Sequence, residues 1–491
     1  MNKVHKLQGM ADISQKAWTK KQALQDRLLE LSGRHGYRRL ETPILEPTEL
    51  FLRKSGGQLA SQLYSFTDAG SNPVSLRPEF TSPIMRHYLE RSGELTLPVR
   101  WQYAGPVFRY EDDGGSSGQF TQIGAELLGS SSIMAEAELL GLAALIPAHL
   151  DLDGYTLELA DLDLMNSVLD TVNISDRARN FIVSGIPQLR DGPNATGSAI
   201  DSALGKAIEI RLMAGGDQDD SLTQGIQGLD DIQAKKVLQG LLDWNTSSEL
   251  GNPGAQLGQR SSGDVVERML RKVRGSDTEP NLRKALELAA ELASIRGEPP
   301  VAIESARQVV KDSGADTAAL DRLERLLELI LADPAVEGRL IIDLGMLRGL
   351  AYYNGIVFEV RHDKWPTALG GGGRYDGLAS ALGSPSPVPA LGFAYNLEAL
   401  LALTELNSDS AESETFSATT LVTCGDSANY GNALQAAQEI RQSGQSVELD
   451  VCGFGLNEAL AYAESKGIQR VVVASQDGVR TEHQVAVGKP A

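Results

Sequence analysis

Residues 347–359 read Leu-Arg-Gly-Leu-Ala-Tyr-Tyr-Asn-Gly-Ile-Val-Phe-Glu, and residues 371–377 read Gly-Gly-Gly-Arg-Tyr-Asp-Gly. The first stretch runs into Ile356–Arg361, whose apolar, β-branched composition predicts a strand. Each stretch alone is weak evidence, because tyrosine pairs and glycine-rich turns are common in cores and loops. Their order along the chain, together with three stretches nearer the N-terminus, decides the fold.

The three other stretches carry the same pattern of polar and apolar positions as a known family. Residues 36–47 read Gly-Tyr-Arg-Arg-Leu-Glu-Thr-Pro-Ile-Leu-Glu-Pro, and residues 76–81 read Leu-Arg-Pro-Glu-Phe-Thr. Residues 108–111, Phe-Arg-Tyr-Glu, precede residues 118–126, Gly-Gln-Phe-Thr-Gln-Ile-Gly-Ala-Glu. Taken in order, all five stretches resemble the motifs of class II aminoacyl-tRNA synthetases of the histidine-specific branch. The resemblance covers most of the chain outside its middle.

The rest of the chain divides by composition. Short strand-like runs follow one another from Pro73 to Gly129, which favours an antiparallel sheet over βαβ units. The middle is rich in Leu, Ala, Glu, Arg and Lys and predicts helices at Asp230–Trp244, Leu282–Ile295 and Thr317–Leu331. After the acidic, Ser-rich linker Asn407–Glu414, strand and helix patterns alternate to Ala474.

We therefore expect an α+β protein with a class II synthetase-like antiparallel sheet flanked by helices. The expected domains are a catalytic-type domain in two parts (1–174 and 337–405), a helical insertion (175–336), and a small C-terminal α/β domain like the anticodon-binding domain (416–491). The last is expected to be truncated, because no final helix follows its strands.

The resemblance implies a histidine pocket, and the residue types suit that ligand. An ammonium group needs acceptors, for which Glu79, Thr81 and Gln122 are candidates. An imidazole needs a carboxylate or hydroxyl to fix its tautomer. The candidates for this are Glu126, Tyr352, Tyr353 and Tyr375. Two family arginines match Arg109 and Arg348 and complete the predicted set of histidine-binding residues.

Two departures from the family lie on the side that would hold ATP. The loop of the second motif, residues 112–118, reads Asp-Asp-Gly-Gly-Ser-Ser-Gly where the family is basic. In the third motif, Ala399 stands where the resemblance places an arginine over ATP. Since adenylate formation depends on electrostatic stabilisation of phosphate charge, a methyl group cannot replace that arginine. We therefore expect no catalytic residue and no activity of the chain's own.

This pattern is similar to the regulatory subunits of ATP phosphoribosyltransferase, synthetase paralogues used in histidine biosynthesis. The resemblance implies a cytoplasmic, allosteric subunit that binds histidine and a short catalytic subunit, as a homodimer within a hetero-oligomer. One alternative is a divergent histidyl-tRNA synthetase that forms histidyl-adenylate and charges tRNA. Another is a synthetase-like sensor of a partner or of uncharged tRNA.

The composition of the chain helps to distinguish these possible functions. The formal net charge is -20, from 45 basic and 65 acidic residues, which argues against a large tRNA footprint. No apolar stretch is long enough to span a membrane, so no membrane partner is expected. The six histidines are scattered without the spacing of metal ligands, so neither a metal nor a cofactor is predicted.

Overall fold

The computed structural model consists of a large unit and a small C-terminal unit, which are described separately. The residues that the structure describes are 4–7, 9–53, 56–110, 118–190, 201–206, 233, 235–237, 277–346, 352–407, 420–424, 429–443, 445–475 and 479–485.

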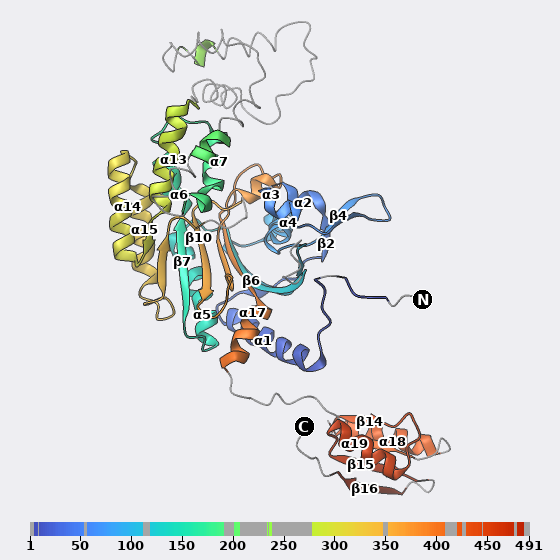
Figure 1. Cartoon of the computed structure of the whole chain (residues 1–491). Helices are drawn as coiled ribbons and strands as arrows, with labels where there is room; N and C mark the ends of the chain where they lie inside the picture. The colour runs from blue at the N-terminus through green and yellow to red at the C-terminus, as the bar shows by residue number, and fades with distance from the viewer. Residues whose placement is uncertain are drawn as a thin grey trace. The chain divides into compact units, whose positions relative to one another are not determined.

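A nine-stranded mixed sheet forms the centre of the large unit, in the order β1-β5-β6-β12-β11-β10-β7-β9-β8 (Figure 1). All neighbours are antiparallel except the pairs β1–β5 and β7–β9. The strands are β1 (Arg38–Arg39), β5 (Val99–Phe108), β6 (Gln119–Leu128), β7 (Tyr155–Asp161), β8 (Arg296–Gly297), β9 (Leu340–Asp343), β10 (Ile356–His362), β11 (Gly370–Arg374) and β12 (Ala390–Asn396). A separate three-stranded sheet joins β2 (Leu45–Pro47), β4 (Pro73–Leu76) and β3 (Ser65–Thr67).

Alternation along β6 separates the two faces of the sheet. Ile123, Ala125 and Leu127 belong to the main apolar core. Because successive side chains of a strand point to opposite faces, Gln122 and Glu126 lie on the other face. That second face is covered by a smaller core containing Phe80 and the buried face of α4 (Thr81–Arg91). The polar residues of β6 therefore lie beneath a covered surface of the sheet.

Helices lie on both faces of the central sheet. Near the N-terminus are α1 (Gln15–Arg34), α2 (Thr48–Leu52), α3 (Gly56–Ser61) and the 3-10 turn η1 (Ser92–Glu94). The central helices are α5 (Ile133–His149), α6 (Leu162–Leu169), α7 (Asp176–Ser184), α8 (Ile186–Leu189), α13 (Glu279–Ala293), α14 (Pro299–Ser313) and α15 (Ala318–Ile330). After the glycine strand come α16 (Leu378–Ala381) and α17 (Leu397–Asn407).

Local signals explain where the central helices begin and end. Ser132 accepts a hydrogen bond from the Met134 amide at the start of α5, as an N-cap residue does. Gly314 ends α14 in the left-handed conformation, with φ of 72°. Along α15, Leu320, Leu323 and Leu327 repeat at helical spacing and are buried.

The small unit has a four-stranded sheet in the order β14-β13-β15-β16, with β13 parallel to both neighbours and β16 antiparallel. Its elements are β13 (Thr420–Thr423), α18 (Tyr430–Gln442), β14 (Val447–Leu449), α19 (Leu456–Lys466), β15 (Arg470–Ala474) and β16 (Arg480–Gln484). The predicted alternation of strands and helices is present within this unit.

The predicted α+β class with a large sheet flanked by helices is confirmed, and the sheet is mixed because two pairs are parallel. The helices predicted at Leu282–Ile295 and Thr317–Leu331 correspond to α13 and α15. The helix predicted at Asp230–Trp244 lies mostly outside the described residues. The proposed domain limits stay a prediction.

The glycine strand β11 yields a test of the fold. A Cβ at Gly372 would lie 1.9 Å from the Gly392 carbonyl oxygen and 2.7 Å from Phe393 Cα, both of which are backbone atoms. We expect Gly372→Ala to lower the free energy of unfolding by about 1–3 kcal/mol or more, because the neighbouring strand must shift. Denaturant unfolding of the purified protein measures this change.

Gly205 provides the control, because it lies in the helical residues 201–206 and a Cβ there would meet no atom within 4 Å. We expect Gly205→Ala to be neutral or to stabilise by up to roughly 1 kcal/mol. Equal effects of the two substitutions would contradict the close contact between β11 and β12.

Candidate functional site

A buried carboxylate on β6 is the centre of the candidate site. Glu126 is 1% exposed, and three hydroxyl groups donate hydrogen bonds to it. Thr81 Oγ1 lies 3.0 Å and Tyr103 OH 3.2 Å from Oε1, while Tyr375 OH lies 2.5 Å from Oε2. Burial raises the pKa of Glu126 to about 8, although the hydroxyl donors oppose that shift. The group can therefore hold or release a proton near neutral pH.

The predicted residues Thr81, Glu126 and Tyr375 thus meet, but Tyr103 was missed by the sequence analysis. Its ring stacks on Phe80 with centroids 4.3 Å apart, and burial raises its pKa well above the usual range. Tyr103 pairs with Gly124 across the β5–β6 ladder. A tyrosine opposite a glycine, on the pocket side of a predicted strand, is the signal that could have identified it.

The lack of a side chain at Gly392 leaves room for the Glu126 carboxylate, and the lack of one at Gly124 leaves room for the Tyr103 hydroxyl. A Cβ at Gly392 would lie 1.4 Å from Glu126 Oε2, and one at Gly124 would lie 2.6 Å from Tyr103 OH. Gly392 and Glu126 are direct partners in the β12–β6 ladder. The floor of the site is therefore bare backbone, which only glycine permits at these positions.

A second carboxylate, Glu79, lies at the start of α4. It is 2% exposed, and both of its oxygens accept from the Ser82 amide, at 3.1 and 3.2 Å. Burial raises its pKa, while the hydrogen bonds and the charge of Arg109 oppose the shift. Repulsion between Glu79 and Glu126 also raises the pKa of Glu126. The site therefore gains from a cationic ligand.

Gln122 lies on the same face of β6 as Glu126, and Tyr352 packs against Tyr353 and Tyr375. Gln122 is buried, and its Oε1 has no hydrogen-bond partner among the described residues. Tyr352 is buried, with its ring centroid 4.9 Å from that of Tyr353 and 5.9 Å from that of Tyr375. These residues offer one open acceptor and a wall of aromatic rings.

Of the two predicted arginines, Arg109 and Arg348, the structure describes only Arg109. Arg109 Nε donates to the Pro78 carbonyl at 3.0 Å, and its guanidinium lies 5.2 Å from the centroid of Phe120. It is electrostatically linked to Glu79, so the structure brings it to the site. Arg348 lies outside the described residues.

At the position of the third motif, Ala399 is 1% exposed and belongs to the main core. Its amide donates to Asn396 Oδ1 at 3.1 Å, which caps the start of α17. The preceding Glu398 accepts from the amide and hydroxyl of Thr121, at 2.8 and 2.9 Å, and from Lys21 Nζ at 3.4 Å. The helix start is therefore anchored to β6 and α1 without a cation at residue 399.

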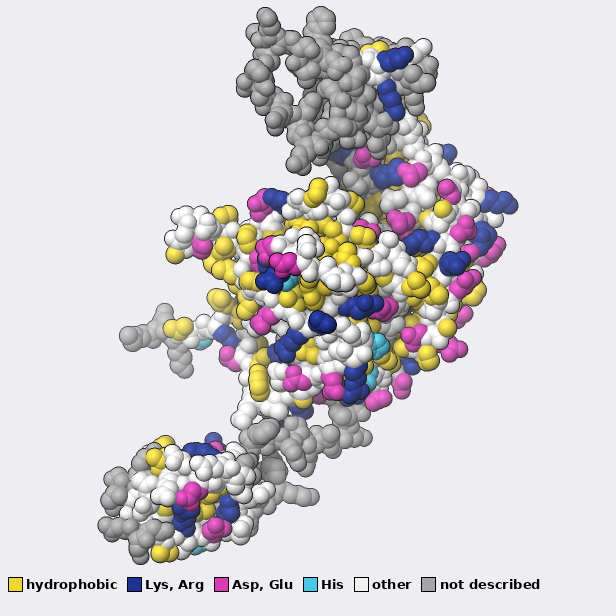
Figure 2. Space-filling model, turned by 180° about the vertical axis from the view of Figure 1, so that it is seen from behind, with side chains coloured by type: hydrophobic (Ala, Val, Ile, Leu, Met, Phe, Trp, Pro, Cys, Tyr) yellow, Lys and Arg dark blue, Asp and Glu magenta, His cyan; other side chains and the backbone are white. Residues whose placement is uncertain are grey.

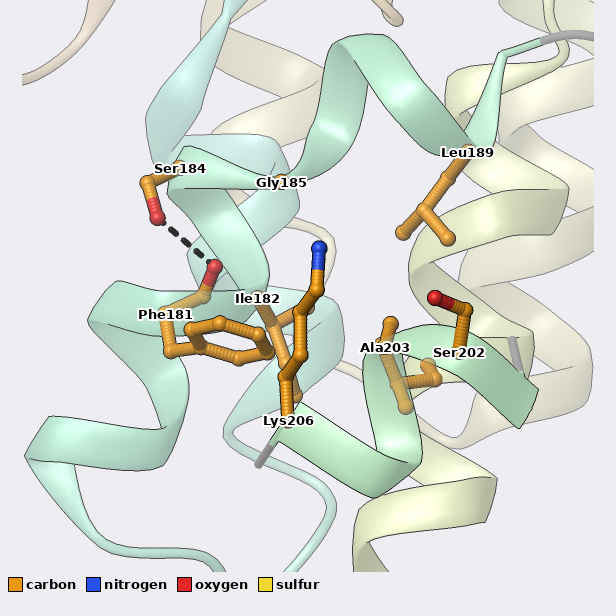
Figure 3. A pocket seen from close by; sticks show the side chains of 9 residues that line it. Phe181, Ile182, Ser184, Gly185, Leu189, Ser202, Ala203 and Lys206 are labelled. Atoms are coloured by element: carbon orange, nitrogen blue, oxygen red, sulfur yellow. Dashed lines mark hydrogen bonds between the residues drawn. The ribbon is translucent and has the colours of Figure 1, made fainter. Parts of the chain in front are cut away.

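A cavity of about 290 Å³ lies elsewhere, between helices of the predicted insertion (Figure 3). Figure 3 shows the Lys206 chain beside Phe181, with Leu189 and Ser202 across the opening. None of the predicted site residues lines it. The geometry of Glu126 and Glu79, rather than this cavity, locates the candidate site. Among the described helices, none is long and apolar enough to cross a membrane.

Comparison with known proteins supports the same family. The family model for histidyl-tRNA synthetase matches residues 9–196 and 255–400. The histidine–tRNA ligase of Methanocaldococcus jannaschii is 28% identical over 474 residues, covering 96% of this chain and 92% of that protein. The histidine–tRNA ligase of Pyrococcus furiosus is 27% identical over 476 residues, covering 96% and 91%.

Solved structures show the same fold. A Bacillus halodurans protein described as an ATP phosphoribosyltransferase regulatory subunit/histidyl-tRNA synthetase aligns with a TM-score of 0.60 at 22% identity, covering 96% of this chain and 98% of that one. Histidyl-tRNA synthetase from Nostoc aligns with a TM-score of 0.59 at 16% identity, covering 99% and 97%. These likenesses confirm the class II synthetase-like fold.

The predicted identity as a non-catalytic regulatory subunit of ATP phosphoribosyltransferase was wrong. The curated relatives are histidine–tRNA ligases, and they align over the C-terminal unit as well, so that unit is no unusual addition. The predicted role in histidine biosynthesis depended on that identity and was therefore wrong as well. The same holds for the predicted short catalytic subunit, the hetero-oligomer and the allosteric feedback. The inference of no activity was also wrong, because the curated relatives are named as ligases. That inference had generalised from Ala399 and one loop to the whole chain.

The expectation that tRNA is an unlikely partner was also wrong, because relatives that align over 96–97% of this chain are named histidine–tRNA ligases. Net charge is a sum over the whole surface and does not describe any one part of it. On the face shown in Figure 2, basic side chains are interspersed among acidic ones over the described residues.

The family model covers well over half of the sequence. The chain therefore belongs to the histidyl-tRNA synthetase family.

Proposed function

We propose that this protein is a histidine–tRNA ligase, which activates histidine with ATP and transfers it to tRNA. The observation that carries the proposal is Glu126, buried in a family fold and held by three hydroxyl donors. A carboxylate has about four lone-pair sites, and the hydroxyls use three of them. One site on Oε2 remains to accept an N–H group of the imidazole.

The α-ammonium group of histidine would be bound on the other side of the pocket. Glu79 supplies a buried negative charge, and the Gln122 Oε1 atom supplies an acceptor that has no described partner. Thr81 sits between the two carboxylates in sequence and contacts Glu126. Tyr352, Tyr353 and Tyr375 would enclose the ring. When ionised, both carboxyl groups favour a positively charged amino acid over a neutral one of the same size.

On the ATP side, Arg109 and Arg348 are the proposed cations. Arg109 is already held beside Glu79 by the Pro78 carbonyl, so its charge lies near the amino-acid site. Adenylate formation brings a negative phosphate next to the carboxylate of histidine, and a fixed guanidinium stabilises that charge. Since charging of tRNA serves translation, a cytoplasmic location goes with this proposal.

The first test is histidine-dependent exchange of pyrophosphate into ATP, followed by charging of histidine-specific tRNA. We expect exchange that depends on histidine and is not supported by glutamine or phenylalanine. Charging should follow with the same amino-acid selectivity. Absence of both reactions with the intact protein would refute the ligase proposal.

The pocket itself is tested by substitution of Glu126. We expect Glu126→Ala to weaken histidine binding by about 1.5–3 kcal/mol, roughly 10- to 150-fold in Kd, because a charge-assisted hydrogen bond is lost. Isothermal calorimetry measures the binding constant directly. An unchanged Kd would remove Glu126 from the pocket.

A matched pair of tyrosines controls for burial. Tyr375→Phe removes a hydroxyl that bonds Glu126, whereas Tyr395→Phe removes one that donates to the Ala143 carbonyl at 2.7 Å on the main-core side. Only the first should weaken histidine binding. Equal weakening by both would point to a general loss of stability.

The raised pKa of Glu126 predicts a pH dependence of stability. Its ordinary value is 4.5 and its folded value about 8, so between these limits the folded state holds a proton that the unfolded state has released. Rising pH therefore lowers the free energy of unfolding, by at most roughly 1.4 kcal/mol per pH unit, and this contribution is lost once the pH passes about 8.

Urea unfolding at several pH values between 5 and 8.5 would measure this effect. The pKa of Asp161 is also raised by burial, to about 7, so part of the dependence persists without Glu126. We expect a shallower decline for Glu126→Gln than for the wild-type protein. Parallel curves would show that Glu126 titrates at its ordinary pKa.

A further inference from the structure

A buried ion cluster lies at the end of β11, the strand that Tyr375 directly follows. Glu136 of α5 is fully buried, and its Oε1 accepts from Arg374 Nε at 2.5 Å and from Arg322 Nη2 at 2.6 Å. Arg374 ends β11 and is 4% exposed. Arg322 comes from α15, which packs against α5 (Figure 1). The cluster therefore joins the last helix of the predicted insertion to the glycine strand.

Arg374 ends β11, and the Tyr375 amide continues the ladder by donating to the Ala390 carbonyl at 2.8 Å, so the two side chains point to opposite sides of the sheet. On one side Arg374 reaches Glu136, and on the other Tyr375 reaches Glu126 at 2.5 Å. The position of one side chain therefore constrains the other through the shared backbone.

Arg374 also fixes the turn that follows the tyrosine pair. Its carbonyl accepts from the Asn354 amide at 2.8 Å, one residue after Tyr353. A Cβ at Gly355 would lie 3.3 Å from Arg374 Cδ, so the aliphatic part of the side chain packs under that turn. Both tyrosine-bearing segments of the site thus depend on where Arg374 lies.

A contribution to folding stability does not by itself explain this buried cluster, because burying its charges costs desolvation free energy. Arg374 Nη2, Arg322 Nη1 and Glu136 Oε2 are buried, and none has a hydrogen-bond partner among the described residues. Buried ion pairs are weak evidence for stability, because desolvation offsets the attraction between the charges. A role in orienting β11 explains why the buried charges of Glu136, Arg322 and Arg374 are present.

Building on the proposed ligase function, we propose that Arg374, held by Glu136 and Arg322, is a positioning residue for histidine recognition. It sets Tyr375 against Glu126 and supports the turn after Tyr353. Through Arg322, α15 of the predicted insertion contributes to the geometry of the amino-acid site, although it does not line that site.

Substitution of Glu136 in the full-length protein tests this role. We expect Glu136→Gln to raise the KM for histidine in pyrophosphate exchange by roughly 2- to 30-fold, with kcat and the KM for ATP little changed. The reason is that Arg374 loses one of its two charged partners, Glu136, and keeps only Asp376 at 3.1 Å, so Tyr375 is held less firmly. Calorimetric Kd values for histidine should weaken by a similar factor.

Glu138→Gln is the matched control. Glu138 lies two residues further along α5 and forms an ion pair with Arg100, with two contacts of 2.7 Å, but this pair does not include Arg374. Its KM for histidine should match that of the wild-type protein. An unchanged histidine KM in Glu136→Gln, or parallel losses of kcat in both variants, would overturn the proposal.

A second variant guards against misfolding of Glu136→Gln. Arg322→Met removes the guanidinium but keeps an unbranched side chain at the partly exposed edge of the cluster. It should also raise the histidine KM, and no change there would count against the role of α15. If the wild-type protein shows no exchange, the ligase proposal fails separately, and calorimetric histidine binding by these variants still decides the role of Arg374.

Discussion

Burial of the Glu126 carboxylate is the constraint around which the site is organised. A charge removed from water needs hydrogen-bond donors, and this one receives three from residues far apart in sequence: Thr81, Tyr103 and Tyr375. α4, β5 and the residue after β11 must therefore lie at fixed positions over β6. The sheet register provides these positions, because Glu126 is opposite both Trp101 and Gly392.

The glycines of the neighbouring strands follow from the same constraint. Any side chain at Gly392 would occupy the space of the Glu126 carboxylate, and any side chain at Gly372 would meet the backbone of β12. The glycine run that opens the stretch 371–377 is thus a requirement for close strand approach rather than for a flexible turn. On the opposite face, Arg374 ties the same strand to α5 through Glu136.

The fold class and the helices at α13 and α15 could be predicted from the sequence, because their patterns are local. Glu79, Thr81 and Glu126 became candidates through the resemblance of their motifs to the family, and the structure brings Thr81 and Glu126 into contact. Sequence reasoning missed Tyr103, since a tyrosine in a strand resembles an ordinary core residue until its partner across the sheet is known. It also gave no sign of the Glu136–Arg374 contact, which joins residues 238 apart in sequence. Such long-range polar pairs depend on packing and not on local pattern.

The wrong identity arose from treating Ala399 and the acidic loop at residues 112–118 as decisive. Ala399 is packed in the core at the capped start of α17, so its replacement of an arginine is compatible with an intact fold. Because residue 399 carries no charge, another residue must supply the positive charge next to the phosphate of ATP. Because catalysis of this kind depends on the total field at the reacting group, and not on one named position, a ligase built on this chain has to place the charge on other arginines. Arg109, fixed by the Pro78 carbonyl and facing Glu79, is the described residue best placed to carry it.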